Sequence, residues 1–138
     1  MKFCSQCGNP VTQRIPEGDS RLRFVCDSCH TIHYQNPNIV AGCVPTWGTQ
    51  VLLCRRAIEP RRGYWTLPAG FMELGETTAE GAARETDEEA GAQIEMQELF
   101  TEAEVPWEDI AFHTVRDTLG RFFDDRRQGR FGLHHFNI

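Results

Sequence analysis

Two pairs of cysteines near the N-terminus constrain the fold of this 138-residue chain more than any other feature. Cys4 and Cys7 form one Cys-x-x-Cys pair, and Cys26 and Cys29 form a second. This double spacing is typical of a structural zinc site, in which four thiolates close a tetrahedral shell around the ion. Residues 1–37 are too few to bury a core of their own. We therefore expect Zn²⁺ to stabilise them as a separate unit.

The remaining residues of this first unit fit a small domain held together by a metal. Three short runs of strand-like composition, 11–15, 21–25 and 31–35, are separated by a polar turn and by the second cysteine pair. His30 and His33 are alternative ligands, but a complete set of cysteines favours surface or packing roles for them. The unit resembles a zinc ribbon, a fold that carries no fixed function.

Charge and cysteine usage narrow the class of protein. A formal net charge of −6 and a pI near 5.3 argue against a chain that holds nucleic acid mainly by neutralising phosphates. No apolar run approaches the roughly 20 residues that span a bilayer, and residues 1–8 lack the apolar centre of a signal peptide. Metal-binding cysteines fit a reducing compartment. Cys43 and Cys54 lie among apolar residues, and we assign them no chemistry. We expect a cytoplasmic protein with no membrane partner.

Residues 38–138 leave room for one further domain. Its first apolar runs, 39–44 and 50–56, are joined by residues 47–49 and predict a β-hairpin, with Pro45 at the end or the edge of the first strand. A basic loop follows. Arg55 and Arg56 at the end of the second run, and Arg61 and Arg62 in the loop, gather positive charge. These arginines fit two roles equally well: they are exposed to solvent, or they contact substrate phosphates.

The stretch 70–92 predicts an amphipathic helix that begins at about Thr77. Thr77 and Glu80 have the spacing of a capping box, in which the hydroxyl and the carboxylate each bond a backbone N–H at the start of the helix. Small residues recur at helical spacing and predict a face that packs against the core. They are Ala79, Ala82, Ala83, Thr86 and Ala90. Gly91 is the expected residue after the C-terminus of the helix.

A second stripe of the same helix carries Glu85, Glu88 and Glu89. Like charges three or four residues apart destabilise a helix slightly, whereas a divalent cation would reverse the sign of that effect. Gly81 lies on the same side, where its missing side chain would leave room for a ligand. An ordinary solvated acidic face is the competing interpretation.

The last third of the chain predicts one more strand and one more helix. Residues 93–100 look like the strand, 101–107 like a connecting turn, and 108–127 like the helix. Ala111, Val115, Leu119 and Phe122 keep helical spacing and are the expected core face, flanked by Phe112 and Phe123. The tail 130–138 alternates weakly enough to add a short strand, and His134 and His135 are expected to be exposed.

The spacing within 70–91 resembles the Nudix box, the signature of hydrolases that cleave nucleoside diphosphates linked to another moiety. All seven fixed positions are present: Gly70, Glu76, Arg84, Glu85, Glu88, Glu89 and Gly91. Thr86 departs mildly from the hydrophobic residue of the pattern. With the zinc ribbon in front, the chain is similar to the zinc-ribbon Nudix hydrolases. That resemblance implies an α/β/α sandwich with a mixed sheet for residues 38–138 and a zinc ribbon for residues 1–37.

The resemblance also implies roles for individual residues. Glu85 and Glu89 would bind Mg²⁺ or Mn²⁺ directly, with the Ala69 carbonyl as a further ligand. Glu88 would be a ligand or the general base. Glu76 would act through water or hold the loop, and Arg84 would orient Glu85 or Glu76. Oxygen ligands suit these cations, and the metal would shield the pyrophosphate and activate the attacking water.

Within that family, the sequence is most similar to ADP-ribose and FAD pyrophosphatases. Hydrolysis of ADP-ribose would give AMP and ribose 5-phosphate. NADH pyrophosphatases share the architecture but carry a Ser-Gln-Pro-Trp-Pro-Phe-Pro array after the box, which this sequence lacks. NADH is therefore a weaker expectation. The predicted partner is a nucleotide-derived small molecule.

The sequence departs from the family in the connection after the box. Only residues 93–105 precede the segment that resembles the closing helix, which is too short for the further strands of the family. Either those strands are deleted, leaving open sheet edges and a route to a homodimer, or residues are missing between Leu99 and Phe100, which we favour slightly. The alternative function is a catalytically silent Nudix-like domain whose ribbon binds protein or nucleic acid.

Overall fold

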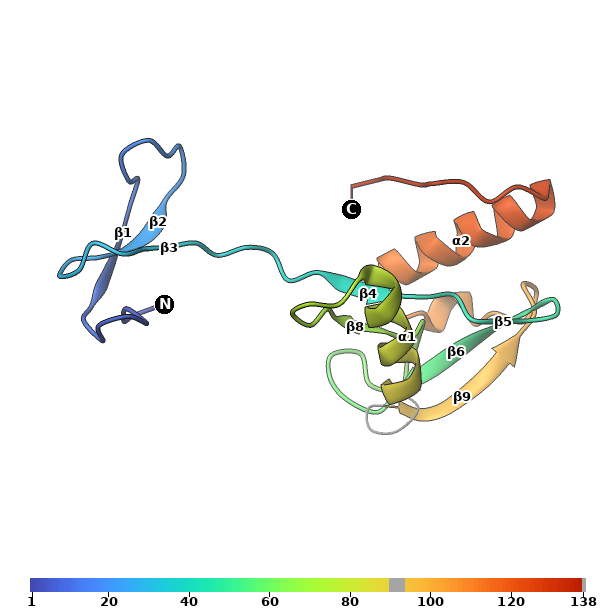
Figure 1. Ribbon diagram of the computed structural model, residues 1–138. Helices are drawn as coiled ribbons and strands as arrows, with labels where there is room; N and C mark the ends of the chain where they lie inside the picture. Colours follow the sequence, from blue (N-terminus) through green and yellow to red (C-terminus); the bar gives the residue numbers. More distant parts are fainter. Residues whose placement is uncertain (90–93, 138) are drawn as a thin grey trace. The chain divides into compact units, whose positions relative to one another are not determined.

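The structure is a computed structural model that describes residues 1–89 and 94–137. Contacts within the chain divide it into two compact units, Met1–Asn38 and Ile39–Ile138. Each unit has its own sheet or sheets (Figure 1). None of the described helices is long and apolar enough to cross a membrane.

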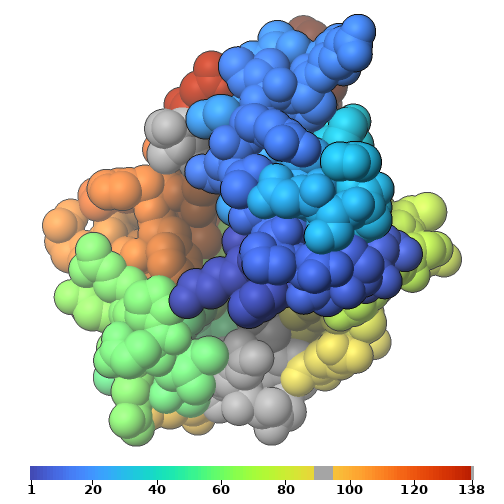
Figure 2. Space-filling view, turned by 90° about the vertical axis from the view of Figure 1, so that its left-hand side faces the viewer, coloured from blue at the N-terminus to red at the C-terminus, as the bar shows by residue number. Residues whose placement is uncertain are grey.

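The first unit is a three-stranded antiparallel sheet. Its strands are β1 (Val11–Arg14), β2 (Arg23–Cys26) and β3 (Ile32–His33), in that order. The three expected runs therefore all form strands, somewhat shorter than their sequence patterns. In this unit only Cys4, Val25 and Cys26 are buried among the described residues, so its apolar interior is minimal. Figure 2 shows the atoms of this unit in shades of blue.

The second unit is built on a long central strand, β6 (Gln50–Arg56). Val51 pairs with both Thr46 and Phe100, so β5 (Thr46–Trp47) and β9 (Ile94–Phe100) lie on opposite edges of β6. Strand β7 (Trp65–Thr66) pairs with β6 on the β5 side. These pairs are antiparallel, and a parallel bridge joins Trp65 to Ile110.

A separate antiparallel pair consists of β4 (Val40–Gly42) and β8 (Ala69–Phe71). Helix α1 (Thr78–Glu89) packs against both of these strands. The short 3₁₀ helix η1 (Trp107–Asp109) and helix α2 (His113–Gln128) follow β9. The helices thus pack on the strands in the layered α/β arrangement that the sequence predicts.

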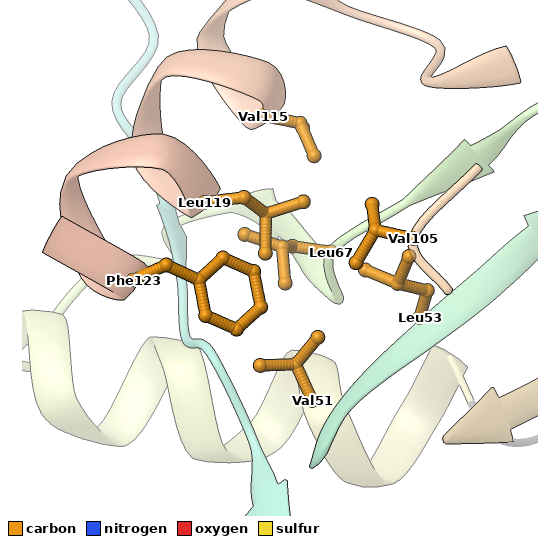
Figure 3. Close-up of a cluster of buried hydrophobic side chains, with 7 residues drawn as sticks. All are labelled: Val51, Leu53, Leu67, Val105, Val115, Leu119 and Phe123. Carbon is orange, nitrogen blue, oxygen red and sulfur yellow. The ribbon is translucent and has the colours of Figure 1, made fainter. Parts of the chain in front are cut away.

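The core of the second unit lies between α2 and the sheet (Figure 3). Val51 and Leu53 point from β6 toward Leu119 and Phe123 of α2, and all four are nearly inaccessible to solvent. Val115, Leu67 and Val105 complete the cluster. Burying one such side chain contributes about 1.5–3 kcal/mol, so this cluster is sufficient to fix α2 on the sheet.

The predicted hairpin turns at 47–49, but the run 39–44 does not form its first strand. Strand β4 ends at Gly42 and pairs with β8 instead, while only the short β5 pairs with β6. Pro45 has no N–H to donate, and its carbonyl accepts from Leu52 at 2.9 Å. The extended segment is therefore divided at Pro45, and its first half joins another sheet.

The second helix begins five residues later than predicted, at His113 rather than at residue 108. Residues 108 and 109 lie in η1, and residues 110–112 are held in an extended form, because the Ala111 N–H donates to the Trp65 carbonyl at 2.8 Å. Val115 and Leu119 are buried as expected, but the third core residue is Phe123 and not Phe122. Gly129 ends the helix in the left-handed conformation, as glycine does most readily.

The C-terminal tail forms no strand within its described part, residues 130–137. It is tied to α2 through Asp125, whose carboxylate accepts from the Gly132 N–H at 3.0 Å and contacts His134 Nε2 at 2.8 Å. The pKa of Asp125 is lowered by these bonds, that from Gly132 first. His134 is exposed as expected, yet it anchors the tail.

Strand β9 covers the step at which the sequence suggested missing residues. Leu99 and Phe100 pair with the consecutive residues Leu52 and Val51, so β9 runs through this step without interruption. The backbone then turns at 101–104 and enters η1, with no further strand in the described chain between them. The choice between deleted strands and omitted residues at this step stays a prediction, and β9 lies at the edge of the described sheet.

Candidate active site

The start of α1 is fixed by the capping box that the sequence predicts. The Glu80 N–H donates to the Thr77 hydroxyl at 3.2 Å, and the Thr77 N–H donates to the Glu80 carboxylate at 2.8 Å. The Thr77 N–H first, and then the Thr77 hydroxyl, donate to the Glu80 carboxylate and lower its pKa. The expected start of the helix is thus confirmed. The cap fixes where the first turn lies and hence where the following acidic residues project.

Arg84 is the centre of the acidic cluster. Its Nε and Nη2 donate to both oxygens of Glu76 at 3.0 and 2.8 Å, and its Nη1 donates to Glu85 at 2.7 Å and to Glu88 at 3.1 Å. Nη2 also donates to the Phe71 carbonyl at 3.0 Å. One guanidinium therefore offsets the repulsion between three carboxylates.

These contacts shift the proton affinities of the cluster. Hydrogen bonds from Arg84, and then from the Glu73 N–H, hold the pKa of Glu76 below its ordinary value. The bonds that Arg84 donates, that to Glu76 first, raise the pKa of Arg84 above its ordinary value. Both groups are charged at neutral pH, so Glu76 and Arg84 form an ion pair.

Two glycines make room for these carboxylates. A Cβ built on Gly70 would lie 2.1 to 2.4 Å from the carboxylate atoms of Glu85, so Glu85 lies directly over the backbone of β8. A Cβ on Gly81 would lie 2.7 Å from Glu76 Oε1. The space at Gly81 is thus filled by Glu76 and is not the ligand space that the sequence suggested.

The predicted buried face of α1 is partly wrong. Ala79 and Ala83 are exposed, and Ala82 and Thr86 are only half-buried. The side chain of Glu85 is 15% exposed. It therefore does not lie on a solvated acidic face. The helix turns its glycine and charged side toward β4 and β8, because the Arg84 network and the close approach at Gly70 require it. Thr86 contacts Cys43, with 3.0 Å between Oγ1 and Sγ.

Some predicted residues cannot be placed. The side chain of Glu89 and the residues Ala90 and Gly91 lie outside the described part of the structure. Ala69 opens β8 directly before Gly70 and is half-buried. Glu88 is the most exposed carboxylate of the network, with 63% of its side chain accessible. Glu85 and Glu88 thus share Arg84 at the solvent boundary of the helix.

The four arginines in and next to the basic loop divide into two kinds. Arg55 and Arg56 use their Nε atoms to bond the Gly63 and Pro60 carbonyls at 3.0 and 2.8 Å. Arg61 lies over the ring of Tyr64, and Arg62 forms an ion pair with Glu95 at 3.5 Å. The first two hold the loop in shape, while Arg61 and Arg62 are exposed.

In the first unit the four cysteines come together as predicted. Their sulfur atoms all lie within 4.8 Å of one another, and three of the pairs are separated by 3.4 to 3.7 Å. A regular tetrahedron with bonds of about 2.3 Å to zinc places sulfurs about 3.8 Å apart. Hydrogen bonds from Thr31 lower the pKa of Cys29 to about 6, which favours the thiolate. The cluster fits Zn²⁺, and His33 Nε2 contacts Cys4 from outside it at 3.3 Å.

Comparison with protein families agrees with both units. Residues 2–35 match the family described as Nudix N-terminal, and residues 36–134 match the NUDIX domain. This chain belongs to the Nudix hydrolase family. A crystal structure of a NUDIX hydrolase from Nitrosomonas europaea is 44% identical, with a TM-score of 0.92 over 97% of each chain. The Nudix fold that the box suggested is therefore confirmed.

Curated relatives of this Nudix chain carry more specific names. An NAD-capped RNA hydrolase NudC from Vibrio vulnificus is 34% identical over 109 residues, 78% of this chain and 38% of that protein. The human mitochondrial NAD(P)H pyrophosphatase NUDT13 is 32% identical over 106 residues, 77% of this chain and 29% of that protein. The chain thus spans less than two fifths of the length of these relatives.

Sequence reasoning missed one contact of the Nudix site. The Phe71 carbonyl accepts from Arg84, and no side-chain pattern could reveal a backbone acceptor. The only sequence signal for this acceptor is that Phe71 directly follows Gly70, in a strand that passes beneath the helix.

Proposed function

We propose that this chain is a metal-dependent pyrophosphohydrolase that acts on a nucleoside diphosphate linked to another moiety. The observation that carries the proposal is the network in which Arg84 gathers Glu76, Glu85 and Glu88 beside the glycine of β8. A surface helix without function has no need to hold three carboxylates together.

The residues present fit a hard divalent cation. Mg²⁺ or Mn²⁺ would be held by Glu85 and Glu89, with the Ala69 carbonyl as a further ligand and Glu76 acting through water. When bound, the cation would shield the pyrophosphate charge and activate the attacking water. Gly70 supports this assignment, because it keeps β8 close enough for its backbone and the Glu85 carboxylate to share one ion.

The side chains of the protein have distinct proposed tasks. Arg84 positions Glu76 and Glu85, which are largely shielded from solvent, at 13% and 15% exposed. Glu88 is accessible and is the group that accepts a proton from water. Arg61 and Arg62 are the arginines proposed to contact substrate phosphates, while Arg55 and Arg56 hold their loop.

The substrate class is a second level of the proposal. The sequence pattern favours ADP-ribose or FAD, whereas the names of the relatives point to NAD(P)H and NAD-capped RNA. All of these compounds contain a pyrophosphate joined to an adenosine, which is the feature that the proposed site would cleave. The relative named for RNA weakens the expectation, drawn from net charge, that nucleic acid is an unfavourable partner.

A catalytically silent Nudix domain is the second candidate. The observation in its favour is the short connection after β9, where the described chain passes to η1 without another strand. Without the further strands of the family, the sheet has fewer residues that could enclose a substrate. Metal binding without hydrolysis would be the mark of this alternative.

One experiment separates the two candidates. The full chain is incubated with Mg²⁺ or Mn²⁺ and with ADP-ribose, FAD, NADH or NAD-capped RNA, and AMP or 5′-phosphorylated RNA is measured. We expect release with at least one substrate and a loss of at least 100-fold in Glu89→Gln, because one ligand of the metal is weakened. Asp87→Asn, an exposed neighbour on α1, is the matched control and should keep full activity. Mn²⁺ binding without turnover of any substrate would favour the silent domain.

A further inference from the structure

The metal cluster of the first unit has a buried half and an exposed half. Cys4 and Cys26 are 3% and 0% exposed, whereas Cys7 and Cys29 are exposed. Each Cys-x-x-Cys pair thus contributes its first cysteine to the interior and its second to the surface. We call Cys4 and Cys26 the inner pair, and Cys7 and Cys29 the outer pair.

The two Cys-x-x-Cys segments divide in this way because they repeat one turn. The Gly8 N–H donates to the Cys4 carbonyl at 2.9 Å, and the His30 N–H donates to the Cys26 carbonyl at 3.1 Å. Gly8 and His30 both have positive φ, 74° and 60°. In both turns the second cysteine is the exposed one. The division into inner and outer sulfurs is therefore a property of the fold of this unit.

Contacts around the sulfur atoms cover the inner pair further. Cys4 Sγ accepts from the Gln6 N–H at 3.4 Å and is contacted by His33 Nε2 at 3.3 Å. Cys26 Sγ accepts from the Cys29 N–H at 3.4 Å. The outer sulfurs lie 3.4 Å apart on the exposed side of the cluster. An oxidant in solution therefore meets the outer pair first, and the two sulfurs that it meets are neighbours.

We propose that the outer pair is an oxidation site, at which hydrogen peroxide converts Cys7 and Cys29 to a disulfide and zinc is released. The proposal concerns the first unit alone, so it does not depend on the proposed hydrolase activity. Zinc ligands are thiolates, and the thiolate is the form of cysteine that reacts with peroxides. Exposure then selects which thiolates react.

The reaction balances with hydrogen peroxide as the oxidant. One outer thiolate attacks a peroxide oxygen, so that an S–O bond forms, the O–O bond breaks, and the leaving hydroxide takes a proton from solvent. The other outer thiolate attacks the sulfur of this sulfenic acid, so that the S–S bond forms and hydroxide leaves and is protonated. The two thiolates together lose two electrons, and one peroxide becomes two waters.

Formation of this disulfide removes half of the ligand set. Neither sulfur of a disulfide is a thiolate, so only the inner pair would remain to hold the ion. A structural zinc site needs four ligands to close its shell. Zinc would therefore leave as the outer pair is oxidised, and reduction of the disulfide would restore the site.

The test uses the reduced full chain, whose zinc content is measured first. Hydrogen peroxide is added, released Zn²⁺ is followed with a metal-binding dye, and disulfides are mapped by mass spectrometry of peptides. We expect release of one Zn²⁺ per chain together with the loss of two thiols, and a first disulfide between Cys7 and Cys29. Dithiothreitol with added Zn²⁺ should reverse both changes.

A control variant shows that the released ion comes from this cluster. Cys43→Ser removes a half-buried thiol outside the cluster and should leave the rate and the amount of zinc release unchanged. The proposal would be overturned by a reduced chain that holds no zinc, or by zinc that stays bound while thiols are oxidised. A first disulfide that includes Cys4 or Cys26, or a release that dithiothreitol does not reverse, would overturn it as well.

Discussion

At the scale of single residues, the site depends on glycines that give space to carboxylates. Gly70 lets the backbone of β8 approach Glu85, and Gly81 lets Glu76 cross the surface of α1. Arg84 then links both carboxylates to Glu88. The two glycines and the Arg84 guanidinium, rather than an apolar contact, decide which side of α1 faces β4 and β8.

Gly70→Ala should therefore abolish hydrolysis while the protein stays folded. The new methyl group would overlap the end of a flexible side chain, so Glu85 would move aside at little cost in stability but would leave its proposed ligand position. We expect a loss of activity of at least 100-fold and an unchanged urea midpoint. Gly120→Ala in α2, where a Cβ meets nothing within 4 Å, is the control and should retain activity.

The Glu76–Arg84 pair predicts a dependence of stability on pH. Because the folded pKa of Glu76 is depressed, its contribution is complete above its ordinary value of 4.5 and is lost as the pH falls through the folded value. The difference in unfolding free energy between wild type and Glu76→Gln should be constant near neutrality and shrink below pH 4.5. Urea titrations at several pH values would measure it. A difference that grows on acidification would contradict the assigned bonds.

At the scale of elements, helix ends follow local rules and helix faces do not. The capping box places the start of α1 from four residues of sequence. By contrast, residues 110–112 have helical spacing but are held in an extended form by the bond to Trp65. A hydrogen bond to a distant strand overrides the local pattern there, and it shifts the start of α2 to His113.

Thr77→Ala should destabilise the second unit by about 1 kcal/mol, because the Glu80 N–H loses its acceptor. Thr77→Ser keeps the hydroxyl and should cost much less. Urea denaturation followed by circular dichroism would give both values. If serine and alanine were equally destabilising, the methyl group and not the cap would be the source of the effect.

At the scale of the whole molecule, the two units depend on different sources of stability. Met1–Asn38 has three buried residues, two of which are cysteines of the cluster, whereas Ile39–Ile138 has the apolar core between α2 and β6. The first therefore depends on its metal site, and the second does not.

Removal of zinc by a strong chelator should unfold the first unit alone. Amide protons of β1 and β2 should lose their protection from hydrogen exchange, while those of β6 and α2 should keep it. Cys29→Ser should have the same effect without a chelator. Retained protection in β1 and β2 after metal analysis shows zinc to be absent would refute the dependence.

The sequence by itself determined the features that rest on short spacing. Two Cys-x-x-Cys pairs identified the metal cluster, the box identified the Nudix domain, and Thr77 with Glu80 identified the start of α1. Each Cys-x-x-Cys pair and the Thr77–Glu80 cap join residues three positions apart, so local geometry alone relates them, whereas the box is recognised by its spacing along the sequence. Such relations hold whatever the rest of the chain does.

Only the tertiary structure decided which segments meet and which faces are buried. Strand β4 pairs with β8 and not with β6, Phe123 is buried in place of Phe122, and Ala83 is exposed. Periodicity shows that a helix has two sides but not which neighbour each side meets. That choice depends on contacts between residues far apart in the chain, such as Gly70 with Glu85 and Trp65 with Ala111.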